Sequence, residues 1–584
     1  MKSNYFTEVN VRVSAMARRV TATVALTASL ALGSSVLVAC GSSDDAVSAK
    51  KVDAESTVLS DDIAASESLI DSSEAVVVSS AGSAEQRRAA GIAIAAGLPM
   101  LVVGSAQDAE DDSTAKSPKK DARGRDTGAN IADVEKEIDR LGAKTVLTVG
   151  AVDLTGGEGR QVIADPGTTE GLKELVGTEF EVLEEPESKP TRAVVEMDPE
   201  KPSVVEDKVA KEGQTNPDAQ DRASDGQDDK GQETVTLPKE SPKEVKDKLA
   251  LVAPGTGLAS IATARAAGLK VSWLPVGDAR ATSESIAAAR DGESLIALGK
   301  VFGDKDKFDQ SIELAKDDKV KELPGGGTLL FPGRHLIATY GHPGVAPLGV
   351  MGEDDPEGAV ARAKDYVKQY EQFADDPVLP AFEIIASVAQ ADPGPRGDYS
   401  EPAPVESLKP YVEAMTKAGG YVIIDLQPGS ADFLDQAKFY EELLKMPNVG
   451  LALDPEWKME PGQVPATEVG HVKAEEVNRV ADWLAELTRN NNLPQKMLML
   501  HQFQLQMIRD RETLDLSHPE LAFVLHADGH GTPQEKFETW NVMLQDLQPE
   551  IFEAWKNFID EDQPMFTPEE TMNIEPRPWL VTYQ

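Results

Sequence analysis

From His335 to its carboxyl terminus, the sequence alternates short apolar runs with longer amphipathic stretches, and this alternation limits the folds that the chain can adopt. The apolar runs lie at residues 335–340, 379–385, 421–426, 449–453, 497–501, 521–526, 552–559 and 579–583. Helical patterns fill the gaps between them, for example at 357–373, 405–418, 430–444 and 474–490. Eight strands alternating with helices over roughly 250 residues have the size and pattern of a (β/α)8 barrel. We therefore predict a barrel over residues 335–584, although Trp555 to Ile559 in the seventh run could also continue a helix.

The amino-terminal half contains a second pattern, which occurs twice. Residues 75–150 read as strand, helix, strand, helix, strand, and residues 249–299 repeat that order. The segment Ala95-Ala96-Gly97-Leu98 recurs as Ala266-Ala267-Gly268-Leu269. Strands that alternate with helices form parallel sheets, and an internal duplication predicts two similar units. We expect an α/β protein in which residues 74–334 form a parallel module of two repeated units.

The ends of the two units carry a further signature. Leu141-Gly142 precedes a strand that ends in Gly150, and Asp291-Gly292 precedes one that ends in Gly299. The unit resembles the type 2 cell-wall-binding repeat of Gram-positive bacteria, although only two copies are visible and each lacks the second glycine of the terminal pair. The resemblance implies binding to a wall polymer, cell-wall polysaccharide or peptidoglycan. A generic α/β unit without a ligand remains the alternative.

The first forty residues have the pattern of an export signal. Arginines precede an apolar run at 20–39, which ends in Leu37-Val38-Ala39-Cys40. This ending resembles the bacterial lipoprotein box. The resemblance implies that residues 1–39 are a signal peptide, that Cys40 is lipidated, and that the protein is anchored at the outer face of the cytoplasmic membrane. Cys40 is the single cysteine of the chain, so an intramolecular disulfide is excluded.

Charge and composition bound the remaining segments. A formal net charge of −42 argues against nucleic acid as a partner, because like charges repel. Residues 40–73 are rich in Ser, Asp and Ala, and we expect a flexible tether there. Residues 184–246 are dense in charged residues and proline with almost no aromatics, which predicts a mostly disordered acidic insertion.

Nearly every predicted barrel strand ends in an ionisable or polar residue. The carboxyl ends of barrel strands meet at one mouth, where the active sites of such barrels lie. Converging charges destabilise a fold unless something binds them, so this pattern predicts a functional site. The candidates are His342, Glu383, Asp425, Gln427, Asp454, Glu456, Trp457, His501, Gln502, His526, Asp528 and Asp560.

A glycoside hydrolase is the first interpretation of this mouth. Asp454 and Glu456 are two residues apart, and in an extended strand they would face the same side. The charge of Asp454 would then raise the pKa of Glu456 and keep it protonated as a general acid. The pair resembles the Asp-x-Glu of family 18 chitinases and family 25 lysozymes, in which the Glu protonates the leaving oxygen. Asp425 or Asp560 would be the alternative second carboxylate.

The other candidates, Trp457 among them, would then bind the sugar, and no cofactor would be needed.

A second interpretation places a divalent metal at the mouth. His501 and His526 end successive strands, as in the amidohydrolase superfamily, with His342, Asp425 or Asp528 as further ligands. The first-strand His-x-His of that superfamily is absent, because Gly341-His342-Pro343 stands there.

A third interpretation is a non-catalytic, wall-binding scaffold, so enzymatic activity is left open. Residues 335–584 as a whole also look like an uncharacterised barrel region of actinobacterial lipoproteins. The landmarks are Tyr340-Gly341-His342-Pro343-Gly344, Pro380-Ala381-Phe382-Glu383-Ile384-Ile385, Leu453-Asp454-Pro455-Glu456-Trp457 and Leu500-His501-Gln502-Phe503. That resemblance implies a Gram-positive surface location and brings no reaction with it.

Overall fold

The computed structural model describes residues 46–50, 56–104, 128–154, 159–183, 190–205, 236–239 and 242–584. The predicted signal peptide and Cys40 lie outside these residues. Among the helices of the described ranges, none combines the length and the apolar character that crossing a membrane requires.

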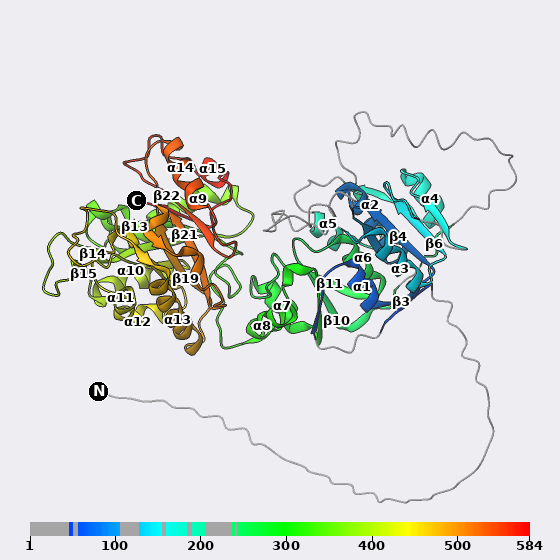
Figure 1. Cartoon of the computed structure of the whole chain (residues 1–584), viewed down its shortest axis with the longest axis horizontal. Helices are drawn as coiled ribbons and strands as arrows, with labels where there is room; N and C mark the ends of the chain where they lie inside the picture. Colours follow the sequence, from blue (N-terminus) through cyan, green and yellow to red (C-terminus); the bar gives the residue numbers. More distant parts are fainter. Residues whose placement is uncertain are drawn as a thin grey trace, which may run out of the picture. The chain divides into compact units, whose positions relative to one another are not determined.

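The carboxyl-terminal part forms the predicted barrel (Figure 1). Its eight parallel strands are hydrogen-bonded in the order β13-β23-β22-β21-β19-β17-β16-β14, and pairing of β13 with β14 closes the ring. They are β13 (His335–Gly341), β14 (Val378–Ala389), β16 (Tyr421–Leu426), β17 (Val449–Leu453), β19 (Lys496–Gln502), β21 (Leu521–Ala527), β22 (Phe552–Asn557) and β23 (Leu580–Tyr583). The ambiguous seventh run therefore forms a strand, which ends at Asn557, and all eight predicted strands are confirmed.

Helices follow most of these strands. They are α9 (Pro356–Tyr370), α10 (Val405–Lys417), α11 (Phe433–Phe439), α12 (Glu441–Leu444), α13 (Ala474–Asn490), α14 (Pro533–Met543) and α15 (Pro568–Met572). Their starts follow from local sequence: the Asp355 side chain caps α9 ahead of Pro356, and Thr532 and Glu535 form a capping box on α14. Three short strands complete the domain, namely β15 (Ser400–Pro402), β18 (Val472–Lys473) and β20 (Ile508–Arg509).

Two apolar cores hold the barrel together. One lies between the strands and the surrounding helices, and the other fills the inside of the ring. Because side chains alternate along a strand, the inward positions of each strand are two residues apart. The inner core is built from these positions, for example Leu336 and Ala338 of β13 and Met497 and Met499 of β19.

The amino-terminal module consists of the two predicted units. The first contains β4 (Ala75–Ser80), α2 (Ser83–Ala96), β5 (Met100–Val103), α3 (Ile131–Leu141), β6 (Thr145–Val149) and β7 (Gln161–Ala164). The second contains β10 (Val245–Val252), α6 (Leu258–Ala266), β11 (Leu269–Trp273), α7 (Ser283–Asp291) and β12 (Ser294–Leu298). The parallel sheets have the equivalent orders β5-β4-β6-β7 and β11-β10-β12-β2. The duplication seen in the sequence is therefore also present in the structure.

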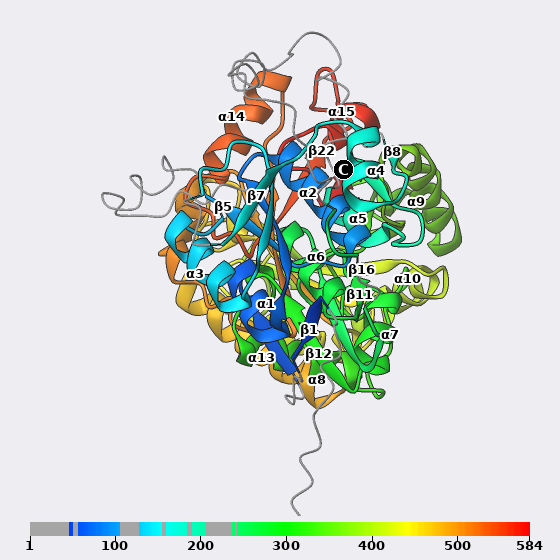
Figure 2. The same ribbon diagram turned by 90° about the vertical axis from the view of Figure 1, so that its right-hand side faces the viewer.

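The two units share one apolar core. Helices α2 and α6 occupy the same place in their units and pack against each other (Figures 1 and 2). The hydroxyl of Thr263 on α6 bonds both the amide and the carbonyl of Met100, at 3.1 Å each. Further elements of this half are α4 (Thr169–Val176), β8 (Glu181–Leu183) and α8 (Lys305–Lys316).

Two boundary predictions are wrong within the described residues. The expected tether contains β1 (Val47–Ala49), β2 (Ser56–Leu59), α1 (Asp62–Leu69) and β3 (Ile70–Ser73). This segment folds because its few apolar side chains, such as Leu59 and Leu69, are buried in the module and β2 pairs with β12. The expected insertion likewise contains α5 (Pro190–Glu196) and β9 (Ser203–Val205), whose Val194 and Val204 are buried. Residues 206–235 lie outside the described ranges.

Candidate functional site

A layer of polar side chains lies at the carboxyl end of the barrel interior. Each member follows an apolar inward residue of the same strand by two positions, as His501 follows Met499 and Thr582 follows Leu580. Every strand contributes to this polar layer, either on the strand or just beyond it. Its members are Tyr340, Glu383, Asp425, Asp454, His501, His526 with Asp528, Lys556 and Thr582.

His501 is at the centre of the polar layer. Its Nε2 lies 2.8 Å from Glu383 Oε1, and its Nδ1 lies 2.6 Å from Asp528 Oδ2. His526 is its register partner on the neighbouring strand, with its Nδ1 3.2 Å from His501 Nδ1 and 3.2 Å from Asp528 Oδ1. The side chains of Glu383, His501 and His526 are fully buried. Two imidazoles and two carboxylates are thus in contact, and of the four only Asp528 is partly exposed.

Hydroxyl groups hold the outer oxygens of two carboxylates. Thr582 Oγ1 donates to Glu383 Oε2 at 3.0 Å, and Tyr340 OH donates to Asp425 Oδ2 at 3.0 Å. The second oxygen of each carboxylate faces His501. Glu383 Oε1 lies 2.8 Å from His501 Nε2, and Asp425 Oδ1 lies 3.9 Å from the same nitrogen. Each carboxylate is therefore held by a hydroxyl at one oxygen, and its other oxygen points to the centre of the polar layer.

Several buried atoms of this layer accept or donate no hydrogen bond within the described part of the chain. They are Glu383 Oε1, Asp425 Oδ1, His501 Nε2, His526 Nε2 and Asp528 Oδ1. Glu383 Oε1 and His501 Nε2 are in ion-pair contact with each other, and Asp528 Oδ1 is in contact with His526 Nδ1. Unsatisfied buried polar atoms are rare in folded proteins, and they call for a functional explanation. Glu383, His501 and His526 each offer one ligand atom, and these atoms lie within 4.8 Å of one another. This group could hold a metal ion or act directly in catalysis.

Lys556 brings a positive charge to the layer. Its Nζ lies 3.7 Å from Asp528 Oδ1 and 4.0 Å above the ring of Tyr340. Burial alone would lower the pKa of Lys556, but the carboxylates of Asp528 and Glu383 outweigh it and raise that pKa. The ammonium therefore stays charged and partly neutralises the buried acids.

Burial and charge also set the ionisation of the acids and histidines. Burial would lower the pKa of His501, yet Asp528 and Glu383 raise it well above its usual value. Burial lowers the pKa of His526 to about 4, so this imidazole is neutral at pH 7. Burial would raise the pKa of Asp528, but His501 and Lys556 lower it and keep this group ionised. Burial raises the pKa of Asp425 to about 7.

The local structure at Asp454 and Glu456 differs from the prediction. Strand β17 ends at Leu453, and Pro455–Trp457 forms a 3-10 turn, so the two acids are not extended neighbours on one strand face. Instead, the Asp454 side chain caps the turn by accepting from the Glu456 amide at 3.2 Å. The proline fixes this turn because its ring restricts φ and removes a donor.

The pKa of Glu456 is nevertheless raised, as predicted, but by a different cause. Burial is the main contribution, followed by the charge of Asp528 rather than that of Asp454. Asp454 itself is buried, and burial raises its pKa well above the usual value. Glu456 and Trp457 are half-buried, so both reach the surface of the mouth.

Four other predicted site residues lie at the edge of the polar layer or away from it. The Asp560 side chain is exposed, and no contact joins it to the polar layer within the described residues. The His342 ring bonds the Ile385 carbonyl through Nδ1 at 2.7 Å. Gln427 accepts from the Ala389 amide, and Gln502 accepts from Arg511. Gln427 also donates through Nε2 to Tyr340 OH at 3.4 Å, which joins it to the polar layer, whereas the contacts of His342 and Gln502 are with the surrounding fold.

Three members of the polar layer were not among the predicted site residues: Tyr340, Lys556 and Thr582. A signal for them exists in the sequence. Each is an inward residue two positions beyond an apolar residue of the inner core, and Lys556 directly follows the apolar pair Ala554-Trp555.

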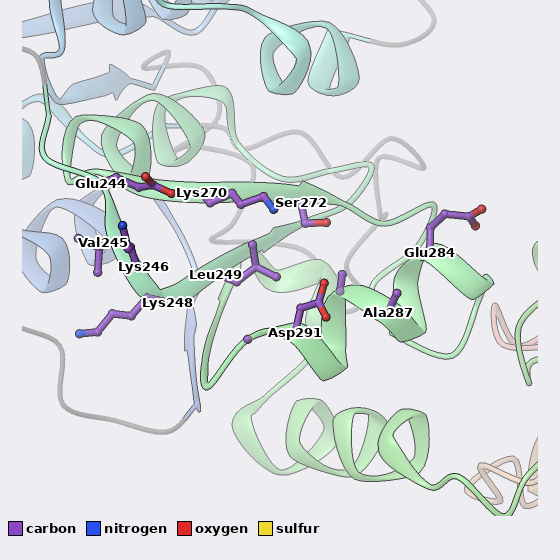
Figure 3. Close-up of a pocket in the computed structure, with 12 residues that line it drawn as sticks. Glu244, Val245, Lys246, Lys248, Leu249, Lys270, Ser272, Glu284, Ala287 and Asp291 are labelled. Carbon is purple, nitrogen blue, oxygen red and sulfur yellow. The ribbon is translucent and has the colours of Figure 1, made fainter.

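The amino-terminal module has a separate surface groove of about 320 Å³, shown in Figure 3. Strands β10 and β11 and helix α7 form it. The labelled side chains include lysines 246, 248 and 270 together with Glu284 and Asp291. Because these charges are mixed and exposed, the groove selects no ligand class.

Neither the family models, nor the curated proteins, nor the solved structures compared with the chain match it. Its function has to be argued from the site.

Proposed function

We propose that the barrel is a hydrolase of cell-wall polysaccharide, a glycoside hydrolase in which Glu456 is the general acid. One observation carries this proposal. Glu456 combines a raised pKa with a half-buried position at the carboxyl end of the fourth barrel strand. A general acid must be protonated near the working pH and must also reach the substrate.

The neighbours of Glu456 support this role. Asp454 holds the turn that presents Glu456 through its bond to the Glu456 amide. Trp457 is half-buried next to it and offers an apolar ring against which a sugar can stack. In the proposed reaction, Glu456 protonates the leaving oxygen as the glycosidic bond breaks. A water molecule would bond to the anomeric carbon and pass its proton to Asp425, the predicted second carboxylate.

The proposed substrate and location rest on the amino-terminal half of the sequence. The Cys40 motif supports lipid anchoring at the outer face of the membrane of a Gram-positive, actinobacterial cell. The duplicated units support binding to cell-wall polysaccharide or peptidoglycan through the repeat that they resemble. Both features would hold the barrel at the wall.

A metal-dependent hydrolase is the second candidate. The specific observation in its favour is the buried group of Glu383, His501 and His526. The two candidates share the barrel mouth and differ in what activates the attacking water. A non-catalytic wall-binding scaffold would retain the same fold without turnover.

The test is release of reducing ends from isolated envelope polysaccharide by the full-length protein. We expect release by the wild type and a loss of at least ~100-fold with Glu456→Gln, since general acid catalysis contributes about 10²–10⁴-fold. The matched control is Glu460→Gln, because Glu460 is an exposed acid on the same loop. Binding to the wall without release by the wild type would contradict the hydrolase and favour the scaffold.

A further inference from the structure

We propose that Glu383, His501 and His526 bind one divalent transition-metal ion, for which Zn²⁺ is the best match. These residues come from the second, fifth and sixth barrel strands, so three separate parts of the chain converge on one point. Two histidines and one glutamate are a ligand set of catalytic zinc sites, in which the fourth position is left to water or substrate.

The spacing of the ligand atoms fits this coordination. In a tetrahedral site with bonds of 2.0–2.2 Å, two ligand atoms lie about 3.4 Å apart. Glu383 Oε1 lies 2.8 Å from His501 Nε2 and 4.0 Å from His526 Nδ1. Shifts of about 0.6 Å in these two distances, within the reach of small side-chain rotations, would give the zinc geometry.

The contacts around the ligands have the form expected of a metal site. A metal-bound histidine usually donates its other ring nitrogen to a carboxylate, which fixes its orientation. His501 has this arrangement, with Asp528 Oδ2 at 2.6 Å from Nδ1 and with Nε2 directed at Glu383. The ligand carboxylate is fixed in turn by the Thr582 hydroxyl on its other oxygen.

The closest contact of the group provides the second argument. Glu383 Oε1 and His501 Nε2 are buried 2.8 Å apart, and neither atom makes a hydrogen bond of good geometry within the described residues. A cation coordinated by both atoms and by His526 Nδ1 would replace this contact and balance the buried carboxylate. Asp425 Oδ1 makes no hydrogen bond there either and lies 3.9 Å from His501 Nε2, where it could bond a water on the fourth position.

The exposed group of Asp482, Asp515 and His518 offers a useful contrast. Its ligand atoms are equally close together, but both carboxylates lie at the surface and His518 already pairs with Asp482 at 3.1 Å. It has neither the burial nor the outer contacts of the barrel site. It therefore serves as an internal control for weak surface binding.

The inference deepens the second candidate, the metal-dependent hydrolase, and depends on that candidate only for the reaction that the metal would serve. A bound divalent ion would lower the pKa of a coordinated water and so supply the attacking group for hydrolysis. The residues of this chain would orient that water and protonate the leaving group. Metal binding itself does not require Glu456 to act.

The full-length protein is treated with a chelator and then titrated with Zn²⁺, and calorimetry monitors the binding. Metal content is measured separately after desalting. We expect one tightly bound equivalent in the wild type. His526→Ala and Glu383→Gln should each weaken binding by at least ~100-fold, and Asp528→Asn by about 10–100-fold because it removes the orienting carboxylate. His530→Ala, an exposed histidine of the same loop, and His518→Ala should leave binding unchanged.

Thermal unfolding separates ligand loss from misfolding. A folded Asp528→Asn with weakened binding supports the site even if an alanine variant does not fold. No Zn²⁺ binding by the wild type, or equal binding by the wild type and folded ligand variants, would overturn the inference. Glu456→Gln should keep the bound equivalent whether or not it turns over substrate, so failure of the general-acid proposal is read separately from failure of the metal site.

Discussion

His501 Nε2 lies 2.8 Å from Glu383 Oε1 in the interior of the barrel, and both side chains are fully buried. Glu383 and His501 come from strands β14 and β19, which are not adjacent in the ring. Their contact therefore crosses the barrel interior and ties opposite parts of the polar layer together. The stability of the barrel should depend on the partners that hold these two groups.

The bond from Thr582 to Glu383 gives the first prediction. Thr582→Val keeps the shape of the side chain but removes the donor to the buried carboxylate, now at 3.0 Å. We expect a loss of about 1.5–3 kcal/mol in the free energy of unfolding, the usual range for hydrogen bonds to charged groups. Urea unfolding measures it, with Thr416→Val as control, because Thr416 is partly exposed and its hydroxyl bonds only the nearby Glu413 carbonyl among the described residues. A change below about 0.5 kcal/mol would show that Glu383 does not depend on this bond.

Lys556 gives the second prediction. Lys556→Met removes the ammonium that lies 3.7 Å from Asp528 and leaves buried acids without that charge. We expect a loss of about 3–5 kcal/mol, as when one partner of a buried ion pair is removed. The exposed Lys364→Met should change stability by no more than about 0.5 kcal/mol. Equal stability of both variants would mean that the ammonium does not offset the buried acids.

Lys496 predicts a pH dependence of stability away from the polar layer. Its Nζ is buried and donates to the carbonyls of Met446 and Val449 at 2.8 and 2.7 Å. Burial lowers its pKa to about 7, whereas the unfolded chain has a value near 10.5. Between these values the unfolded state binds more protons, so the contribution of Lys496 to stability rises with pH.

The measurement compares the wild type with Lys496→Met by urea unfolding between pH 7 and 10. The difference in the free energy of unfolding should shift in favour of the wild type by at most about 1.4 kcal/mol per pH unit. A difference that is constant over this range would contradict the lowered pKa.

Trp457 predicts an effect on substrate binding. Trp457→Ala should weaken binding of soluble wall oligosaccharides without unfolding the barrel, because this ring is half-buried at the mouth. We expect KM to rise and kcat to change less. The control is Trp483→Phe on helix α13, which lies outside the mouth. An unchanged KM would remove Trp457 from the proposed sugar site.

The fold was predictable because the sequence shows two patterns: short apolar runs alternate with longer amphipathic stretches, and apolar residues recur at helical spacing within those stretches. Apolar runs such as Val449–Leu453 and the helical pattern of Ala474–Asn490 have lengths and periods that identify them. The early strand β2 was not predictable in this way. A short polar segment with one buried leucine folds only because β12 offers it an edge, and that edge comes from residues far along the chain.

The candidate site was predictable in part. Glu383, His501 and His526 stand at strand ends and were identified there. The turn after Asp454 was missed because two acids two residues apart were treated as extended, although Pro455 between them favours a turn. Lys556 was missed because the predicted seventh strand ran to residue 559, which pointed to Asp560, whereas β22 ends at Asn557.

The role of Glu456 as proton donor is the central claim, and the dependence of cleavage on the leaving group tests it most directly. The measurement compares kcat/KM of the wild type and Glu456→Gln on a wall oligosaccharide and on an aryl glycoside of the same sugar with an acidic phenol as leaving group. A phenol of low pKa departs without protonation, so Glu456→Gln should lose at least ~100-fold on the oligosaccharide but less than ~10-fold on the aryl glycoside. An equal loss on both substrates, or no loss on the oligosaccharide, would contradict this role.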